Sequence, residues 1–145
     1  MYNFKKPLTI ISLLSLSAIN IATAAEIAFS IDGVKNNNGK LLVALFKGET
    51  GHQSGKPAQY NAVAAKQGKV VVSFKEIKQG EYAIQVFHDE NDNGKLETNL
   101  VGMPTEGYGF SNNAQPNFGP AKYSDMKFAV SNDDAVIENS TTLIY

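Results

Sequence analysis

Large apolar side chains alternate with small or polar ones at a spacing of two along much of this chain. Residues 27–31 (IAFSI) are the clearest example, and the same period recurs in residues 70–74 and 82–86. Residues 41–46 (LLVALF) are apolar at every position. Successive side chains of a strand point to opposite faces, so this period predicts strands with one face in a core. We therefore expect antiparallel sheets, with the 41–46 strand buried on both faces.

Turn and helix signals divide these strands. Residues 36–39 (NNNG) and 78–80 (KQG) contain Asn and Gly, which tolerate positive φ angles and predict turns. Residues 128–130 and 141–145 predict two further strands late in the chain. Only residues 60–66 (YNAVAAK) favour a short helix, because alanine is a good helix former.

Six or seven short strands in one chain of this length predict an all-β fold, a two-sheet antiparallel β-sandwich. The sequence contains no tryptophan and no cysteine, which are hallmarks of true immunoglobulin domains. The remaining expectation is a generic Ig-like Greek key or a transthyretin-like sandwich, formed as a single domain by residues 25–145. Residues 47–60 and 89–125 show no period and are expected to be irregular.

The second irregular segment is long enough to be of interest in itself. Loops of more than about 12–15 residues are usually functional or disordered. This one contains Met103, Tyr108, Phe110 and Phe118, and disordered segments seldom contain so many large apolar residues. We therefore expect a long ordered loop, with these four side chains anchoring it to the sandwich.

The N-terminus has the pattern of an export signal. Two lysines precede an apolar stretch, residues 8–21, and residues 22–24 (ATA) supply a small-x-small cleavage pattern. The apolar stretch is short and contains several serines, unlike the roughly 20 apolar residues of a membrane span. We expect residues 1–24 to be a cleaved signal peptide, so that the protein is periplasmic or secreted, with no membrane span after processing.

The composition of residues 25–145 excludes several classes of function. They contain 11 lysines against 14 acidic residues, a net charge of −3, and no arginine. Nucleic-acid binding is not expected without arginine or a basic stripe. The absence of cysteine means that an exported fold must be held by its core or by a metal rather than by disulfides. We expect a monomer.

The segment that starts at Asp89 predicts a cation site. Asp89, Asn91 and Asn93 offer side-chain oxygens at every second position, and Gly94 permits a sharp turn. This is how a loop wraps calcium, with Lys95 adding its backbone carbonyl.

The remainder of the ligand set departs from the EF-hand pattern. The twelfth position, where a bidentate glutamate belongs, is Leu100. Glu97 and Asn99 are the candidates to complete the shell. With few charged ligands, affinity for calcium is expected to be weak, on the order of 10⁻⁴–10⁻³ M. The alternative is a turn rich in Asx residues whose side chains cap backbone amides.

Two further features suggest ligand contacts. His88 ends a predicted strand beside Asp89, and it is a candidate ligand or general base; the alternative is a strand-end histidine bonded to the loop. We expect the EGYGFSNN segment to form a recognition surface for a sugar or peptide. The alternative is that its aromatic side chains cover one end of the sandwich. The residues of that surface are Glu106, Tyr108, Phe110, Asn112 and Asn113.

The whole stretch resembles the DUF2141 family of exported bacterial proteins. The residues that carry this resemblance are His88 to Leu96, Thr98, Asn99, Gly102, Pro104, Glu106 to Asn113 and Ala114. The resemblance implies export and a β-sandwich fold. The family has no assigned activity, so the resemblance implies no reaction.

Three functions are compatible with these features. The first is a non-enzymatic binding or scaffold module at the cell envelope, stabilised by calcium, that binds an envelope protein, a peptide or a glycan. The second is a hydrolase on a transthyretin-like fold, similar to the hydroxyisourate hydrolases. Those enzymes carry an arginine and a Tyr-Arg-Gly-Ser-type tail, whereas this chain ends Leu143-Ile144-Tyr145. The third is an assembly subunit that pairs through exposed sheet edges.

Overall fold

The computed structural model describes residues 24–131 and 135–145. The predicted signal peptide, residues 1–24, lies outside the described residues except for Ala24. In chain order the elements are β1 (Ala25–Val34), β2 (Lys40–Lys47), α1 (Gly48–Gln53), β3 (Gln59–Ala64), β4 (Gly68–Ile77), β5 (Gly80–Asp89), β6 (Tyr108–Phe110), the 3₁₀ turn η1 (Ser111–Asn113), α2 (Tyr123–Met126), β7 (Phe128–Val130) and β8 (Val136–Thr142).

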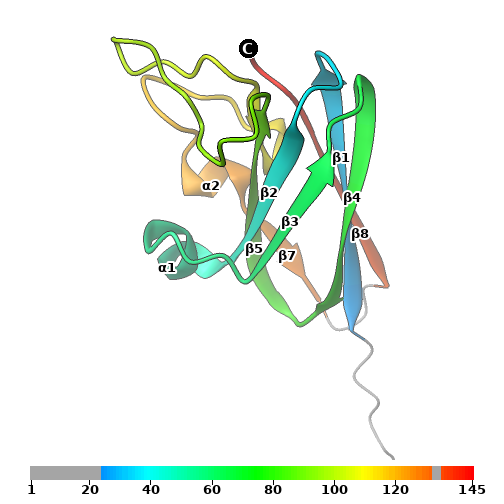
Figure 1. Ribbon diagram of the computed structural model, residues 1–145. Helices are drawn as coiled ribbons and strands as arrows, with labels where there is room; N and C mark the ends of the chain where they lie inside the picture. The colour runs from blue at the N-terminus through cyan, green and yellow to red at the C-terminus, as the bar shows by residue number, and fades with distance from the viewer. Residues whose placement is uncertain (1–23, 132–134) are drawn as a thin grey trace, which may run out of the picture.

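The strands form two facing sheets (Figure 1). One sheet has the order β4-β1-β8, and the other has the order β3-β2-β5-β6, with β7 also paired to β5. The pairs are antiparallel except for β1 with β8, which are parallel. A parallel pair needs a long connection, and here β8 follows strands of the opposite sheet. The predicted all-β sandwich is confirmed, with this one parallel pair as an addition.

The core between the sheets is built from the alternating side chains. Ile27, Phe29 and Ile31 of β1 are fully buried, while the residues between them are only partly buried. The facing sheet contributes the apolar side chains of β2 and β5, namely Leu41, Val43, Leu45, Ile84 and Val86. The period of two therefore places one face of each sheet in the core, as predicted.

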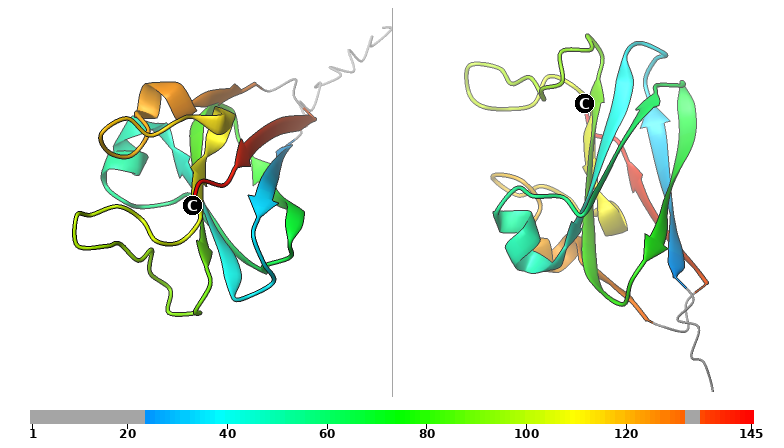
Figure 2. Two further views of the ribbon diagram at one scale, coloured as in Figure 1. Left: turned by 90° about the horizontal axis from the view of Figure 1, so that it is seen from above. Right: turned by 60° about the horizontal axis from the view of Figure 1, so that its bottom comes forward.

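A second layer covers the outer face of the five-stranded sheet. There α1 packs on β2 and β5, and α2 packs on β5 (Figures 1 and 2). Leu42 and Phe46 of β2 are buried on this side, where the Phe46 ring meets the His52 ring of α1 edge to face. This layer explains why residues 41–46 are apolar at every position.

Two local predictions were wrong. The helix expected at residues 60–66 is instead strand β3, and residues 47–60, expected to be irregular, contain helix α1. The helical preference of alanine over an ordinary residue is below about 1 kcal/mol per residue. A continuous ladder from Gln59 opposite Leu45 to Ala64 opposite Lys40 outweighs that preference.

The late part of the chain also differs from the prediction. The last strand covers Val136–Thr142 rather than residues 141–145, and Ile144 then forms a separate bridge with Tyr108. Within the long loop, Phe110 is buried, but the expected anchors Met103 and Phe118 are 58% and 109% exposed. The prediction of four buried anchors was therefore wrong for these two. Within the described ranges, no helix is long and apolar enough to cross a membrane.

Candidate binding site

Asp89 organises the loop that follows β5. Its carboxylate is only 2% exposed, although it lies at the end of a strand. The backbone amide of Asn93 donates to Oδ1 at 3.0 Å, and the amide of Gly94 donates to Oδ2 at 2.8 Å. Gly94 has a φ of +76°, so the glycine allows the turn that brings both amides to one carboxylate.

The other predicted calcium ligands also bond within the loop. Asn91 Oδ1 accepts the amide of Asn93, and Asn93 Oδ1 accepts the amide of Lys95. The side-chain amides of both asparagines donate to Glu97 Oε1 at 2.9 and 2.8 Å. These are the bonds of an Asx-rich turn.

Asn99, the last predicted ligand, caps a different turn further along the chain. Within residues 24–131 and 135–145, no group of three or more His, Cys, Asp or Glu residues could hold a metal ion. Calcium binding by residues 89–99 stays a prediction.

Glu106 ties the two ends of this loop together. Its side chain is 4% exposed, and each carboxylate oxygen accepts one backbone amide. The amide of Glu90 donates to Oε1 at 2.9 Å, and the amide of Glu97 donates to Oε2 at 3.1 Å. The sequence identified Glu106 as a ligand contact, whereas its carboxylate binds the protein's own backbone.

His88 is fully buried in a network with the C-terminus. Its Nε2 lies 2.7 Å from the carbonyl of Asn38, and its Nδ1 lies 2.8 Å from the Tyr145 hydroxyl. A carbonyl only accepts, so Nε2 carries the ring proton and Nδ1 accepts from the hydroxyl. The Tyr145 oxygen in turn accepts the amide of Lys35 at 2.9 Å. Both ring nitrogens are thus engaged inside the protein.

The EGYGFSNN segment joins β8 to the five-stranded sheet. A side chain at Gly107 would come within 2.5 Å of the Tyr145 ring, and one at Gly109 would meet Thr141 of β8 at the same distance. The Phe110 amide donates to the Thr141 hydroxyl. The two glycines are therefore required because the C-terminal strand lies directly against them.

Asn112 and Asn113 extend this junction. Both have positive φ angles, of 59° and 50°. Asn112 donates to two carbonyls next to α2 and accepts the side-chain amide of Asn139, while Asn113 accepts the amide of Thr142. Their predicted ligand role stays a prediction, and the contacts observed are structural.

An apolar pocket lies between two parts of the long loop. We call it the loop pocket, and its volume is about 470 Å³. Its lining residues are Leu96, Thr98, Gly102, Met103, Pro104, Tyr108, Phe110, Pro116, Phe118, Gly119 and Pro120. The two loop parts project beside the five-stranded sheet (Figures 1 and 2). Of the residues predicted to bind a ligand, Tyr108 and Phe110 reach this pocket, with ring centroids 5.9 Å apart.

Sequence reasoning missed the remainder of the loop pocket. Met103 and Phe118 were expected to pack on the sandwich as anchors of the loop, and the prolines were not predicted to line a pocket. A signal was present, because Met103 stands between Gly102 and Pro104, and Phe118 precedes Gly119. Such neighbours place a residue in a turn, and turns lie at the surface.

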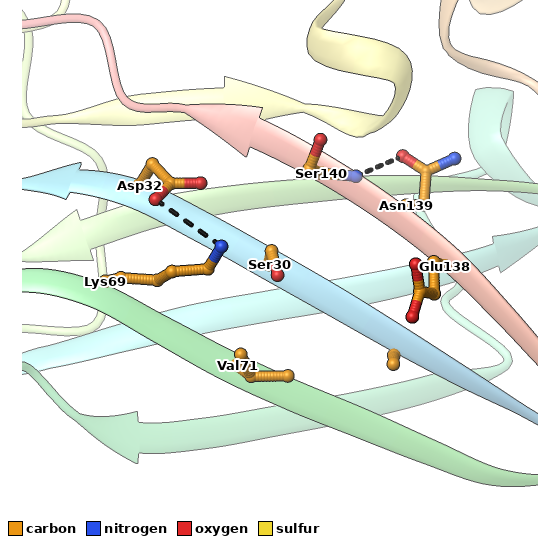
Figure 3. Close-up of a pocket in the computed structure, with 8 residues that line it drawn as sticks. Ser30, Asp32, Lys69, Val71, Glu138, Asn139 and Ser140 are labelled. Carbon is orange, nitrogen blue, oxygen red and sulfur yellow. Dashed lines mark hydrogen bonds and ion pairs between the residues drawn. The ribbon is translucent and has the colours of Figure 1, made fainter.

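A second hollow of about 550 Å³ lies on the outer face of the three-stranded sheet (Figure 3). It forms where the central strand carries the small residues Ala28 and Ser30. Lys69 Nζ lies 3.9 Å from Asp32 Oδ1 across it. This ion pair is exposed to water and therefore weak. Glu138 is the other charged residue of the lining.

Tyr123 of α2, in the layer that covers the five-stranded sheet, has a strongly shifted pKa. The Tyr123 hydroxyl donates to Glu81 Oε1 at 3.0 Å, and Lys127 Nζ lies 3.0 Å from Glu81 Oε2. Burial, and then the hydrogen bond to Glu81, raise the pKa of Tyr123 to about 12. The bonds from Lys127 and Tyr123 lower the pKa of Glu81.

This shift predicts a loss of stability at alkaline pH. The pKa of Tyr123 rises from 10.0 in the unfolded chain to about 12 in the fold. Its contribution to stability is therefore complete below pH 10.0 and is lost as the pH rises through about 12. Urea unfolding across this range should show a smaller loss for Tyr123→Phe than for the wild type. If Tyr123→Phe and the wild type lose the same free energy of unfolding over this range, the pKa shift of Tyr123 is not the cause.

A family model described as "Uncharacterized protein conserved in bacteria (DUF2141)" matches residues 29–138. The match starts within β1, ends within β8, and includes the strands between them and all of the long loop. Neither the curated proteins nor the solved structures contain a match to this chain.

Proposed function

The chain belongs to the DUF2141 family of uncharacterized bacterial proteins, and we propose that it is an exported, non-enzymatic binding module of the cell envelope. The observation that carries this proposal is the loop pocket. None of its lining residues is charged, and most are aromatic, aliphatic or proline. Pockets with this composition hold the apolar part of a ligand.

The dimensions and polar groups of the loop pocket define the ligand further. A volume of about 470 Å³ lies within the range of small-molecule sites, which runs from about 300 to 1,000 Å³. The Tyr108 hydroxyl has no hydrogen-bond partner within the described part of the chain. It is free to bond one polar atom of a ligand. The lining also contains the Thr98 hydroxyl. The ligand group is therefore uncharged and largely apolar, with one or two hydrogen-bonding atoms.

The environment of the histidines supports a binding role over catalysis. A general base must come within hydrogen-bond reach of its substrate. His88 is fully buried, with both nitrogens bonded to Asn38 and Tyr145. His52 Nε2 lies 2.8 Å from the Gln85 side chain. Neither histidine lines the loop pocket.

The sheet edges give the assembly alternative little support. The edges of β3 and β4 face each other, and side-chain amides span the gap. Gln59 donates to the carbonyl of Lys75, and Asn61 donates to the carbonyl of Ser73. Carbonyls already bonded in this way are poor templates for a strand from another chain.

A fluorescent probe tests the loop pocket directly. We expect uncharged N-phenyl-1-naphthylamine to bind the purified protein saturably, with increased emission. Phe118→Ser should weaken this binding by about tenfold, because it removes an aromatic wall of the loop pocket. The melting temperature should not change, since Phe118 is fully exposed.

The matched control is Val71→Ser. Val71 is 55% exposed and lies on the three-stranded sheet, outside the loop pocket. It should bind the probe like the wild type. Equal probe affinity in Phe118→Ser and Val71→Ser would refute the loop pocket as the ligand site.

A further inference from the structure

Residues 97–105 form a narrow hairpin beside the loop pocket, which we call the apex hairpin. The Thr105 amide donates to the carbonyl of Glu97 at 2.8 Å, and the Asn99 amide donates to the carbonyl of Met103 at 2.8 Å. Asn99 Oδ1 accepts the amides of Val101 and Met103, each at 3.0 Å. The backbone at the tip is therefore fixed by its own hydrogen bonds.

The tip of the apex hairpin is apolar, which its turn geometry does not require. Leu100 is 108% exposed and Val101 is 81% exposed. Turn positions normally carry Gly, Asn, Asp, Pro or Ser. Neither side chain packs in the core or lines the loop pocket. Fold stability therefore does not account for these two residues.

A second apolar tip lies across the loop pocket. Phe118 is fully exposed, has a φ of +53°, and lines the loop pocket from the other loop segment. Leu100 and Phe118 are the most exposed large apolar residues in the described chain. Leu100, Val101 and Phe118 belong to the two loop segments that line the loop pocket, and neighbouring exposed apolar residues mark an interaction surface for a protein or a membrane.

We propose that Leu100, Val101 and Phe118 insert into the surface of a zwitterionic phospholipid layer, with the loop pocket facing that layer. The proposal rests on the envelope location in the proposed function. Apolar and aromatic side chains bind at the headgroup boundary in proportion to the apolar area they bury. Because the hairpin backbone is already ordered, binding loses little conformational freedom there.

The charges nearby select the type of lipid. Lys95 and Glu97 are both exposed and opposite in charge where the apex hairpin begins, and Asp92 of the preceding turn pairs with Lys40 at 3.0 Å, so no cluster of one sign lies there. Residues 25–145 carry a net charge of −3 and no arginine. Anionic lipids attract clusters of lysine and arginine, which the lining and tips lack. A zwitterionic surface therefore fits this side of the molecule better than an anionic one.

Sedimentation with lipid vesicles tests the proposal on the protein purified after export. We expect binding to phosphatidylcholine vesicles, and weaker binding when phosphatidylglycerol is added. The double variant Leu100→Asn/Val101→Asn should bind phosphatidylcholine at least about tenfold more weakly. The control variant Val71→Asn/Val136→Asn removes two exposed apolar residues of the three-stranded sheet, 55% and 57% exposed, and should bind like the wild type.

The two proposals fail in different ways. Leu100→Asn/Val101→Asn leaves the loop pocket lining intact, so it should still bind N-phenyl-1-naphthylamine. Loss of vesicle binding with retained probe binding supports the membrane proposal. Vesicle binding that is absent in the wild type, or equal in both double variants, overturns it and leaves the ligand site standing. Concentration-dependent dimerisation abolished by Leu100→Asn/Val101→Asn, without vesicle binding, would assign the tips to a second copy of the chain instead.

Discussion

Glu106→Gln is expected to lower the free energy of unfolding by about 3 kcal/mol. The buried carboxylate accepts the amides of Glu90 and Glu97, one on each oxygen. Glutamine keeps the shape but replaces one acceptor with an NH₂ group that faces an N–H donor. The substitution loses a charge-assisted bond and leaves a part-buried amide donor without a partner, and each of these effects costs about 1–3 kcal/mol.

Thermal melting and urea unfolding will measure this effect. A loss of about 3 kcal/mol should lower the melting temperature by roughly 10 °C in a domain of this size. Glu97→Gln is the matched control in the same loop. Its carboxylate is exposed and accepts only the side-chain amides of Asn91 and Asn93, so water can replace the lost bonds. If both variants lose the same stability, the burial of Glu106 is not the cause.

Gly39→Ala is expected to have the largest effect, a loss of about 4 kcal/mol or more. Gly39 has a φ of +63°, and a Cβ there would collide with the backbone carbonyl of Asp89. A backbone atom cannot rotate away as a side chain can. The start of β2 would have to separate from the end of β5, where Lys40 pairs with Asp89. His88, which bonds the carbonyl of Asn38, would lose its partner as well.

Gly94→Ala separates the cost of a left-handed backbone conformation from the cost of the collision with Asp89. Gly94 also has a positive φ, of +76°, but no atom lies within 4 Å of the Cβ position. Gly94→Ala should lower the free energy of unfolding only by the cost of the left-handed conformation, roughly 1–2 kcal/mol. Urea unfolding of both variants gives the comparison. A Gly39→Ala protein as stable as Gly94→Ala would show that the close approach to Asp89 does not constrain the fold.

The architecture was largely predictable from the alternation of side chains. Ile27, Phe29 and Ile31 are buried because a strand places every second side chain on one face, and this depends only on local geometry. The helix expected at residues 60–66 failed because a local preference competes with a ladder to β2, which the local sequence does not reveal. The parallel pairing of β1 with β8 likewise depends on the path of the whole chain.

The candidate site was predictable only in part. Of the residues singled out between His88 and Asn113, Tyr108 and Phe110 line the loop pocket, and their ligand role stays a prediction. The exposure of Met103 and Phe118 was not predicted, because apolar character alone does not distinguish a buried anchor from an exposed tip. The pocket also needs residues 116–120, which are adjacent to the apex hairpin only in space.

The sequence by itself determined the strands in which side chains alternate, the turns at glycine and asparagine, and the family. Each of these depends on residues close together in the sequence, because their backbone geometry and conformational preferences are local properties. The tertiary structure decided what the polar residues of the long loop do. Asp89 and Glu106 have the chemistry of metal or ligand contacts, but they accept backbone amides because a buried carboxylate needs donors that water no longer supplies. Which amide meets which carboxylate depends on the folded path of the chain, and a pattern of residue types does not contain that path.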